Sequence, residues 1–152
     1  VYKRQQRCGG GRISFEMKGK VLRMILPSGR AINYHKPKII SVETPWNKLV
    51  PALTYHGINS VTRKWTEQRT YGGKLVENAV QAIARDILAE AQMRMESEGW
   101  NIILSVHDEL IAECDEDHAD LEEFASLMAS VPEWATGCPI EAEGWISTRY
   151  RK

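Results

Sequence analysis

One amphipathic segment constrains this chain more than any other feature of its sequence. Apolar side chains recur there at steps of four, three, four, four and four residues: Val76, Val80, Ile83, Ile87, Ala91 and Met95. This period is typical of an α-helix with one apolar face. Gly99 marks the predicted end, because Gly is favoured just past a helix C-terminus.

The opposite face of the predicted helix is polar. At about 100° per residue, five side chains fall together on it: Lys74, Asn78, Gln81, Arg85 and Gln92. A mixture of amides and cations is usually solvent cover on a helix. This face alone therefore does not indicate a function.

Predicted strands precede the helix. Apolar runs on both sides of Pro27-Ser28-Gly29 predict a hairpin in the region that begins at Ile13. Residues 41–73 are polar and contain prolines, so they are predicted to be a long connection with short strand pieces at most. The Trp and Tyr side chains at 46–71 are predicted to anchor the core or loops rather than to stack on bases.

A second group of elements follows the helix. Residues 101–106 predict a buried strand, and another apolar run, 110–112, follows three polar residues. The acidic residues 115–117 are predicted to cap a second helix, which carries apolar side chains through 121–131. Residues 139–146 predict a closing strand. This order predicts the α+β class with an antiparallel sheet.

The ends of the chain and its cysteines bound its class. Val1 to Arg12 contain three consecutive glycines and no apolar period, which predicts a disordered or artificial end before a domain over 13–152. No apolar run approaches the roughly 20 residues of a membrane helix. Three widely spaced cysteines fit a reducing cytosol. We therefore expect a soluble, cytoplasmic protein.

The formal net charge of zero hides an asymmetry between the two halves. Residues 1–75 carry 15 Lys and Arg against 3 acidic residues, and residues 76–152 carry 5 against 17. Clustered cations attract phosphates and release their counterions. The basic half is therefore either a polyanion-binding surface or a solvated face near the acidic half.

The segment Val106-His107-Asp108-Glu109-Leu110 carries the chemistry. Three polar residues, two of them acids, interrupt what is otherwise one apolar run, and none is the Gly, Asn or Pro that a turn there usually prefers. Charges between buried strands need compensation, which a divalent cation with oxygen ligands can supply. The alternative is an exposed hairpin tip without a ligand.

Several motifs, in the right order, resemble the C-terminal part of the palm in family A (DNA polymerase I-type) DNA polymerases, particularly short phage-like ones. Residues 106–109 resemble the third polymerase motif of the family, a β-turn-β with acids at the turn. Residues 77–86 are similar to the helix before that motif, and 26–30 to the Gly-Arg hairpin after the fingers. The tail, 146–152, looks like the end of the phage members. The resemblance covers 13–152.

The resemblance implies a palm-type antiparallel sheet with packed helices and a role for each matched residue. Asp108 would be a ligand of two catalytic Mg²⁺ ions, Glu109 would support them, and His107 would contact the primer end. Contacts with DNA would come from four further residues: Gln81, Arg30, Arg85 and Lys74. Asn78 is not carried over, because it lies three residues before Gln81 rather than four.

The resemblance implies primer–template DNA and a deoxynucleoside triphosphate as partners, in the host cell of a phage or prophage. The second catalytic Asp and the fingers helix of the family are absent from this sequence, so a missing N-terminal remainder of the polymerase would supply them. The chain alone is expected to be inactive. Two alternatives stay open: a non-catalytic duplex-DNA-binding module, and a magnesium-dependent nuclease or other phosphotransferase.

Overall fold

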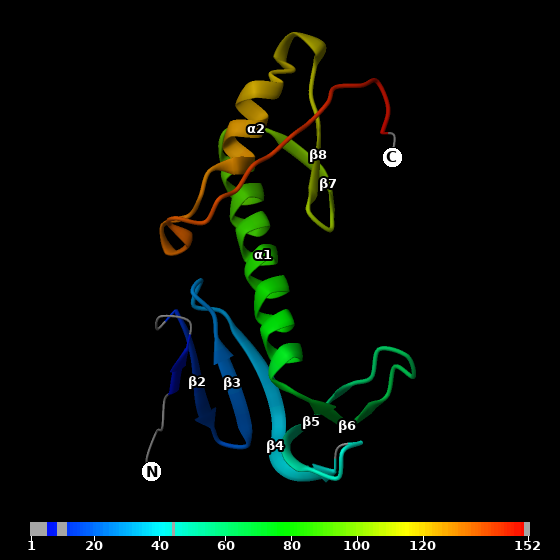
Figure 1. Ribbon diagram of the computed structural model, residues 1–152. Coiled ribbons are helices and arrows are strands. Elements are labelled where there is room, and N and C mark those ends of the chain that lie inside the picture. The colour runs from blue at the N-terminus through cyan, green and yellow to red at the C-terminus, as the bar shows by residue number, and fades with distance from the viewer. Residues whose placement is uncertain (1–5, 9–11, 44, 151–152) are drawn as a thin grey trace. The chain divides into compact units, whose positions relative to one another are not determined.

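The computed structural model describes residues 6–8, 12–43 and 45–150 (Figure 1). The chain divides into two compact units, residues 1–82 and 83–152. Helix α1 (Gly72–Ser97) begins in the first unit and ends in the second. None of the helices in these described ranges is long and apolar enough to cross a membrane.

The first unit is built on a six-stranded antiparallel sheet in which every strand pairs with its neighbour in sequence. The strands are β1 (Gln6–Cys8), β2 (Ile13–Lys18), β3 (Val21–Ile25), β4 (Ala31–Glu43), β5 (Leu49–Ile58) and β6 (Trp65–Thr70). Such a meander needs only short turns between strands, because each strand returns beside the one before it.

The predicted hairpin at Pro27-Ser28-Gly29 is confirmed between β3 and β4. The backbone N–H of Leu26 donates to the carbonyl of Arg30 at 2.8 Å, and that of Gly29 donates to the carbonyl of Leu26 at 2.9 Å. Gly29 has a φ of 84°, which glycine adopts without steric cost. This turn places Arg30 immediately before β4.

Two predictions for the first unit differ from the structure. The predicted long connection at 41–73 is wrong, because it contains the end of β4 and all of β5 and β6. Within the predicted irregular end, Gln6–Cys8 form a strand that pairs with β2. Residues 1–5 and 9–11 of that end lie outside the described residues.

The first turns of α1 pack on the sheet through side chains that the apolar period did not single out. Asn78 donates from Nδ2 to the hydroxyl of Tyr34 at 3.2 Å, and Ala79 and Tyr34 are 4% and 2% exposed. Val76 and Val80, by contrast, are 63% and 60% exposed. The predicted apolar stripe is therefore wrong at its N-terminal end.

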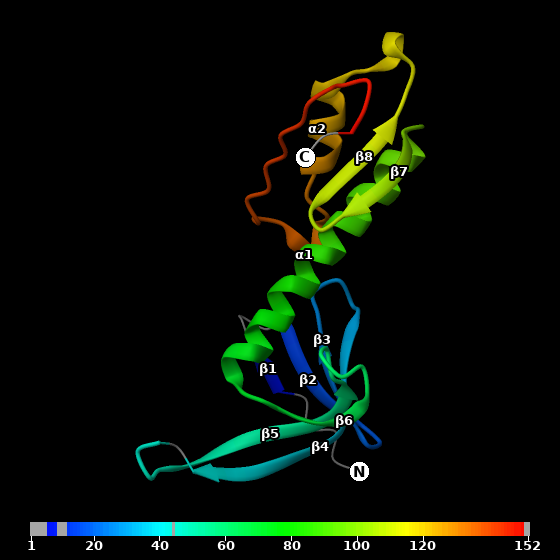
Figure 2. The same ribbon diagram turned by 90° about the vertical axis from the view of Figure 1, so that its right-hand side faces the viewer.

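The second unit packs the rest of α1 against a hairpin and a second helix (Figures 1 and 2). Strands β7 (Asn101–Val106) and β8 (Glu109–Glu113) form a separate two-stranded antiparallel sheet. Its buried core consists of Leu88, Ala91, Met95 and Leu110, surrounded by half-buried Trp100, Ile102, Phe124, Leu127 and Met128. This core holds the hairpin on α1.

Helix α2 (Leu121–Ala129) confirms the second predicted helix, but its cap differs from the prediction. The Asp120 carboxylate accepts the backbone N–H of Glu123 at 2.9 Å, whereas the acidic residues at 115–117 lie around a separate 3-10 turn, Glu116–His118. The side-chain oxygen nearest the free N–H groups at the helix start caps it.

Two strand predictions for the second unit also need correction. Residues 139–146 form no strand, although a closing strand was predicted there. Strand β7 is not fully buried, because Ile103 is 57% and Leu104 46% exposed. The observed architecture mixes helices with antiparallel sheets, and the turn with His107 and Asp108 belongs to the smaller sheet.

Candidate functional site

The His-Asp-Glu segment forms the tight turn between β7 and β8. Val106 pairs with Glu109, so the turn consists of His107 and Asp108 alone. Leu110, which follows Glu109, is 8% exposed and belongs to the core on α1. The buried side chain therefore anchors the hairpin, while all three polar side chains are exposed.

His107 has a strained backbone. Its φ is 53°, in the left-handed region that costs a residue with a Cβ about 1 kcal/mol or more. Asp108 is not among the residues with positive φ. Two-residue hairpin turns with a positive φ at their first position normally have Gly there. The chain keeps a histidine where glycine would fit better, and strain of this kind concentrates at functional sites.

We expect His107→Gly to raise the free energy of unfolding of the second unit by about 0.5–1 kcal/mol. Glycine adopts a positive φ without strain, and this gain exceeds the cost of the greater conformational freedom of glycine in the unfolded chain. Urea unfolding followed by circular dichroism measures the change. His118→Gly is the matched control: His118 is also exposed but is not among the residues with positive φ, so the control should destabilise. A lower free energy of unfolding in His107→Gly would contradict the inference that the backbone of His107 is strained.

The residue after the turn has a partner that the sequence analysis missed. Tyr150 donates its hydroxyl to Oε2 of Glu109 at 3.2 Å. Loss of solvent around that hydroxyl raises the pKa of Tyr150, and the hydrogen bond and charge of Glu109 raise it further. The hydroxyl therefore stays protonated as a donor at neutral pH, and it ties the C-terminal segment to the turn. Only the position of Tyr150 in a basic tail hinted at this role.

Arg85 is an exposed residue of α1 in the second unit. Strand β7 starts just after α1 ends and runs back along it (Figures 1 and 2). Its six residues span about 20 Å, which equals the rise of about thirteen helical residues. For a strand parallel to the helix axis, this distance counted back from Gly99 corresponds to the level of Arg85 and Asp86.

The other predicted DNA-binding residues, Arg30, Lys74 and Gln81, belong to the first unit. Arg30 donates from Nη2 to the carbonyl of Ala82 at 2.9 Å, which brings its guanidinium beside α1. Glu77 accepts from Nζ of Lys74 at 2.8 Å and from Nε2 of Gln81 at 3.5 Å. The hydrogen bond to Glu77 raises the pKa of Lys74.

These contacts define one exposed group along the N-terminal half of α1. Lys74 and Gln81 lie within about 20° of one another around the helix axis, and both are exposed. Glu77, which the sequence analysis missed, binds both side chains and would oppose a phosphate there. Asn78, which the sequence analysis left out of the site, instead holds α1 on Tyr34.

As a metal site, the turn has the chemistry of a partial ligand set. The exposed carboxylate of Asp108 offers two oxygens, the kind of ligand that Mg²⁺ prefers. Glu109 is held by Tyr150. In the described part of the chain, no group of three His, Cys, Asp or Glu side chains lies close enough to hold a metal ion. Asp108 therefore fits as one ligand of a site that needs further groups.

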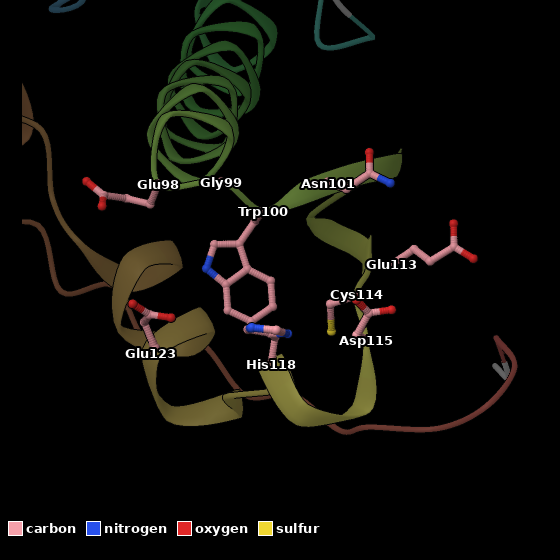
Figure 3. Close-up of a pocket in the computed structure, with 9 residues that line it drawn as sticks. All are labelled: Glu98, Gly99, Trp100, Asn101, Glu113, Cys114, Asp115, His118 and Glu123. Carbon is pink, nitrogen blue, oxygen red and sulfur yellow. The ribbon is translucent and has the colours of Figure 1, made fainter.

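A cavity of about 330 Å³ lies at the other end of the hairpin (Figure 3). Asn101 and Glu113, which line it, are paired at the end of β7 and β8 that is farthest from the turn. Its wall also carries Trp100, Asp115 and His118. None of the predicted polymerase residues lines this cavity, and the carboxylates that surround it would repel phosphates.

Comparison with known proteins gives one relevant similarity. The chain is 38% identical, over 140 residues, to a protein named DNA polymerase from Bacillus phage SP02. The match covers 92% of this chain and 21% of that relative, so the chain spans about a fifth of the relative's length. No protein-family model matches the chain. No solved structure matches it either.

Proposed function

We propose that this chain is a segment of a DNA-directed DNA polymerase of family A, from the C-terminal part of the palm. In the complete enzyme it would take part in template-directed nucleotidyl transfer with two Mg²⁺ ions during DNA replication. The similarity to the phage SP02 protein supports the assignment to a DNA polymerase. The motifs in the sequence are the basis for the narrower assignment to family A and the palm.

The observation that carries the proposal is the turn at His107 and Asp108. A two-residue turn fixes the direction of its side chains more tightly than a long loop, and Leu110 anchors it to the core. The chain accepts a φ of 53° at His107 to keep an imidazole beside an exposed carboxylate. A histidine at this strained position, directly before an exposed carboxylate, is the feature that supports a functional turn.

We assign one task to each polar group at the turn. Asp108 would hold Mg²⁺ through its exposed carboxylate, together with ligands from other parts of the polymerase. Glu109, oriented by the Tyr150 hydroxyl, would add negative charge beside that ligand, and His107 would contact the primer end. When bound, Mg²⁺ lowers the pKa of the attacking 3′-hydroxyl and neutralises charge on the triphosphate.

The exposed polar groups of α1 and its neighbour Arg30 would contact the DNA. Gln81 carries an amide, which suits minor-groove acceptors that all base pairs share. Arg30, Arg85 and Lys74 are cations that suit the phosphate backbone. Glu77 would release Lys74 and Gln81 when DNA replaces its hydrogen bonds.

We expect the 152-residue chain by itself to show no templated nucleotide incorporation, because Asp108 lacks companion ligands in the described part of the chain. A primer-extension assay with a labelled primer–template, four deoxynucleoside triphosphates and Mg²⁺ measures this. The full-length phage SP02 relative is the positive control in the same assay. Template-dependent extension by the purified chain alone would contradict the proposal that it is a segment of the active enzyme.

A further inference from the structure

Three aromatic side chains that were predicted to be core or loop anchors are instead exposed. Trp46 is 83%, Trp65 54% and Tyr71 69% exposed. These three are therefore not core residues. Tyr55 is half-buried and meets Tyr34 edge-on, with ring centroids 5.0 Å apart. An exposed tryptophan on a sheet is a large apolar surface that the fold itself does not use.

Trp65 belongs to one face of strands β4, β5 and β6. The strand register pairs Trp65 with Ile58, and it places Thr54 between Lys38 on β4 and Arg69 on β6. Directly paired residues point to the same side of a sheet, as do residues two apart along a strand. We call this side the β4–β6 face; it includes His35, Lys38, Thr54, His56, Ile58, Trp65, Glu67 and Arg69.

The β4–β6 face is the side that α1 leaves uncovered. Tyr34 precedes His35 on β4, so its side chain points to the opposite side of the sheet. Tyr34 accepts the hydrogen bond from Asn78 of α1, which identifies that opposite side as the one that the helix covers. Lys38, Trp65 and Arg69 on this face are all exposed.

The chemistry of the β4–β6 face matches a single-stranded nucleic acid. The ring of Trp65 lies 5.4 Å from that of His35 at an interplanar angle of 62°, so its position is braced on one side while it remains half exposed. Residues 31–74 carry seven Lys and Arg against two Glu. An exposed aromatic ring among cations is how proteins hold unpaired bases and the phosphates that join them.

We propose that the β4–β6 face is a binding site for single-stranded DNA, in which Trp65 stacks on a base and Lys38 and Arg69 hold the phosphates. Trp65 and Arg69 are four residues apart on β6, or about 13 Å, so one strand of DNA following β6 would meet both. Glu67 lies between them and is within 3.9 Å of His56. The proposal does not depend on the polymerase assignment.

Binding of a fluorescein-labelled twelve-residue oligothymidylate to the 152-residue chain, followed by fluorescence anisotropy, tests the proposal. We expect Trp65→Ala to weaken binding at least about fivefold, the effect of losing one stacked base. Trp65→Phe keeps a stacking ring and should retain most of the affinity. Lys38→Ala combined with Arg69→Ala should reduce the slope of log K against log salt by about 1.4, because each phosphate contact to a single strand contributes about 0.7.

Two controls separate stacking from general attraction or misfolding. Trp145→Ala removes a tryptophan of nearly equal exposure, 55%, from the other unit and should leave the affinity unchanged. An abasic oligonucleotide of the same length should bind more weakly than oligothymidylate and should not respond to Trp65→Ala. The proposal would be overturned if both oligonucleotides bound equally well. It would also be overturned if Trp65→Ala and Trp145→Ala reduced the affinity equally, or if neither reduced it.

Discussion

Asp108→Asn in a complete polymerase that contains this segment is expected to reduce nucleotide incorporation at least about a thousandfold. The substitution keeps the size of the side chain and removes the charge that holds Mg²⁺. Metal-ion stabilisation of the developing charge is worth several kcal/mol of barrier, and about 4 kcal/mol corresponds to a factor of a thousand. Single-turnover incorporation at saturating DNA and nucleotide measures this loss directly.

The affinity of the same variant for primer–template DNA should be largely retained, since the cations and amide assigned to DNA contact lie elsewhere. Asp117→Asn is the matched control, because Asp117 is also an exposed aspartate of the second unit but lies outside the turn. It should leave incorporation unchanged. Comparable incorporation by Asp108→Asn and the unsubstituted enzyme would refute the assignment of a metal ligand at the turn.

The elements that the sequence predicted well are those with local signals. Helix α1 has an apolar period over many turns, and the turn at Pro27-Ser28-Gly29 has residues whose backbone preferences define it. The strand-turn-strand around His107 follows from two apolar runs separated by three polar residues. In each case the residues that specify the structure lie within the element itself.

The elements that the sequence missed depend on partners. Strand β5 contains Pro51 and Gly57, which weaken a strand pattern, but β4 and β6 pair with it on both sides. Residues 139–146 have a strand-like composition but no paired strand in the structure. Pairing between distant segments decides such cases, and single-sequence periodicity does not contain it.

The candidate site shows the same division. The position of His107 and Asp108 at a turn was predictable, whereas the bond from Tyr150 to Glu109 joins residues 41 positions apart. The hydrogen bond from Gln81 to Glu77 could have been predicted, because residues four apart meet on a helix. The exposure of Trp65 follows from the side of the sheet that α1 covers, and no local pattern specified that side.

The second large effect concerns the core that holds the hairpin on α1. Met95 is 0% exposed and lies in the cluster with Leu88, Ala91 and Leu110. We expect Met95→Ala to destabilise the second unit by about 3 kcal/mol, because it removes buried contacts and leaves a cavity. Urea unfolding followed by tryptophan fluorescence measures this, since Trp100 packs against the same cluster.

Met93→Ala provides a control on the same helix with the same substitution. Met93 is 70% exposed, so its loss should change stability by no more than about 0.5 kcal/mol. The difference between the free energies of unfolding of the two variants measures the effect of burial alone. Helix propensity changes equally in both, because both replace Met with Ala inside α1. Equal destabilisation by the two would mean that α1 presents a different face to β7 and β8 than the one that contains Leu88, Ala91 and Met95.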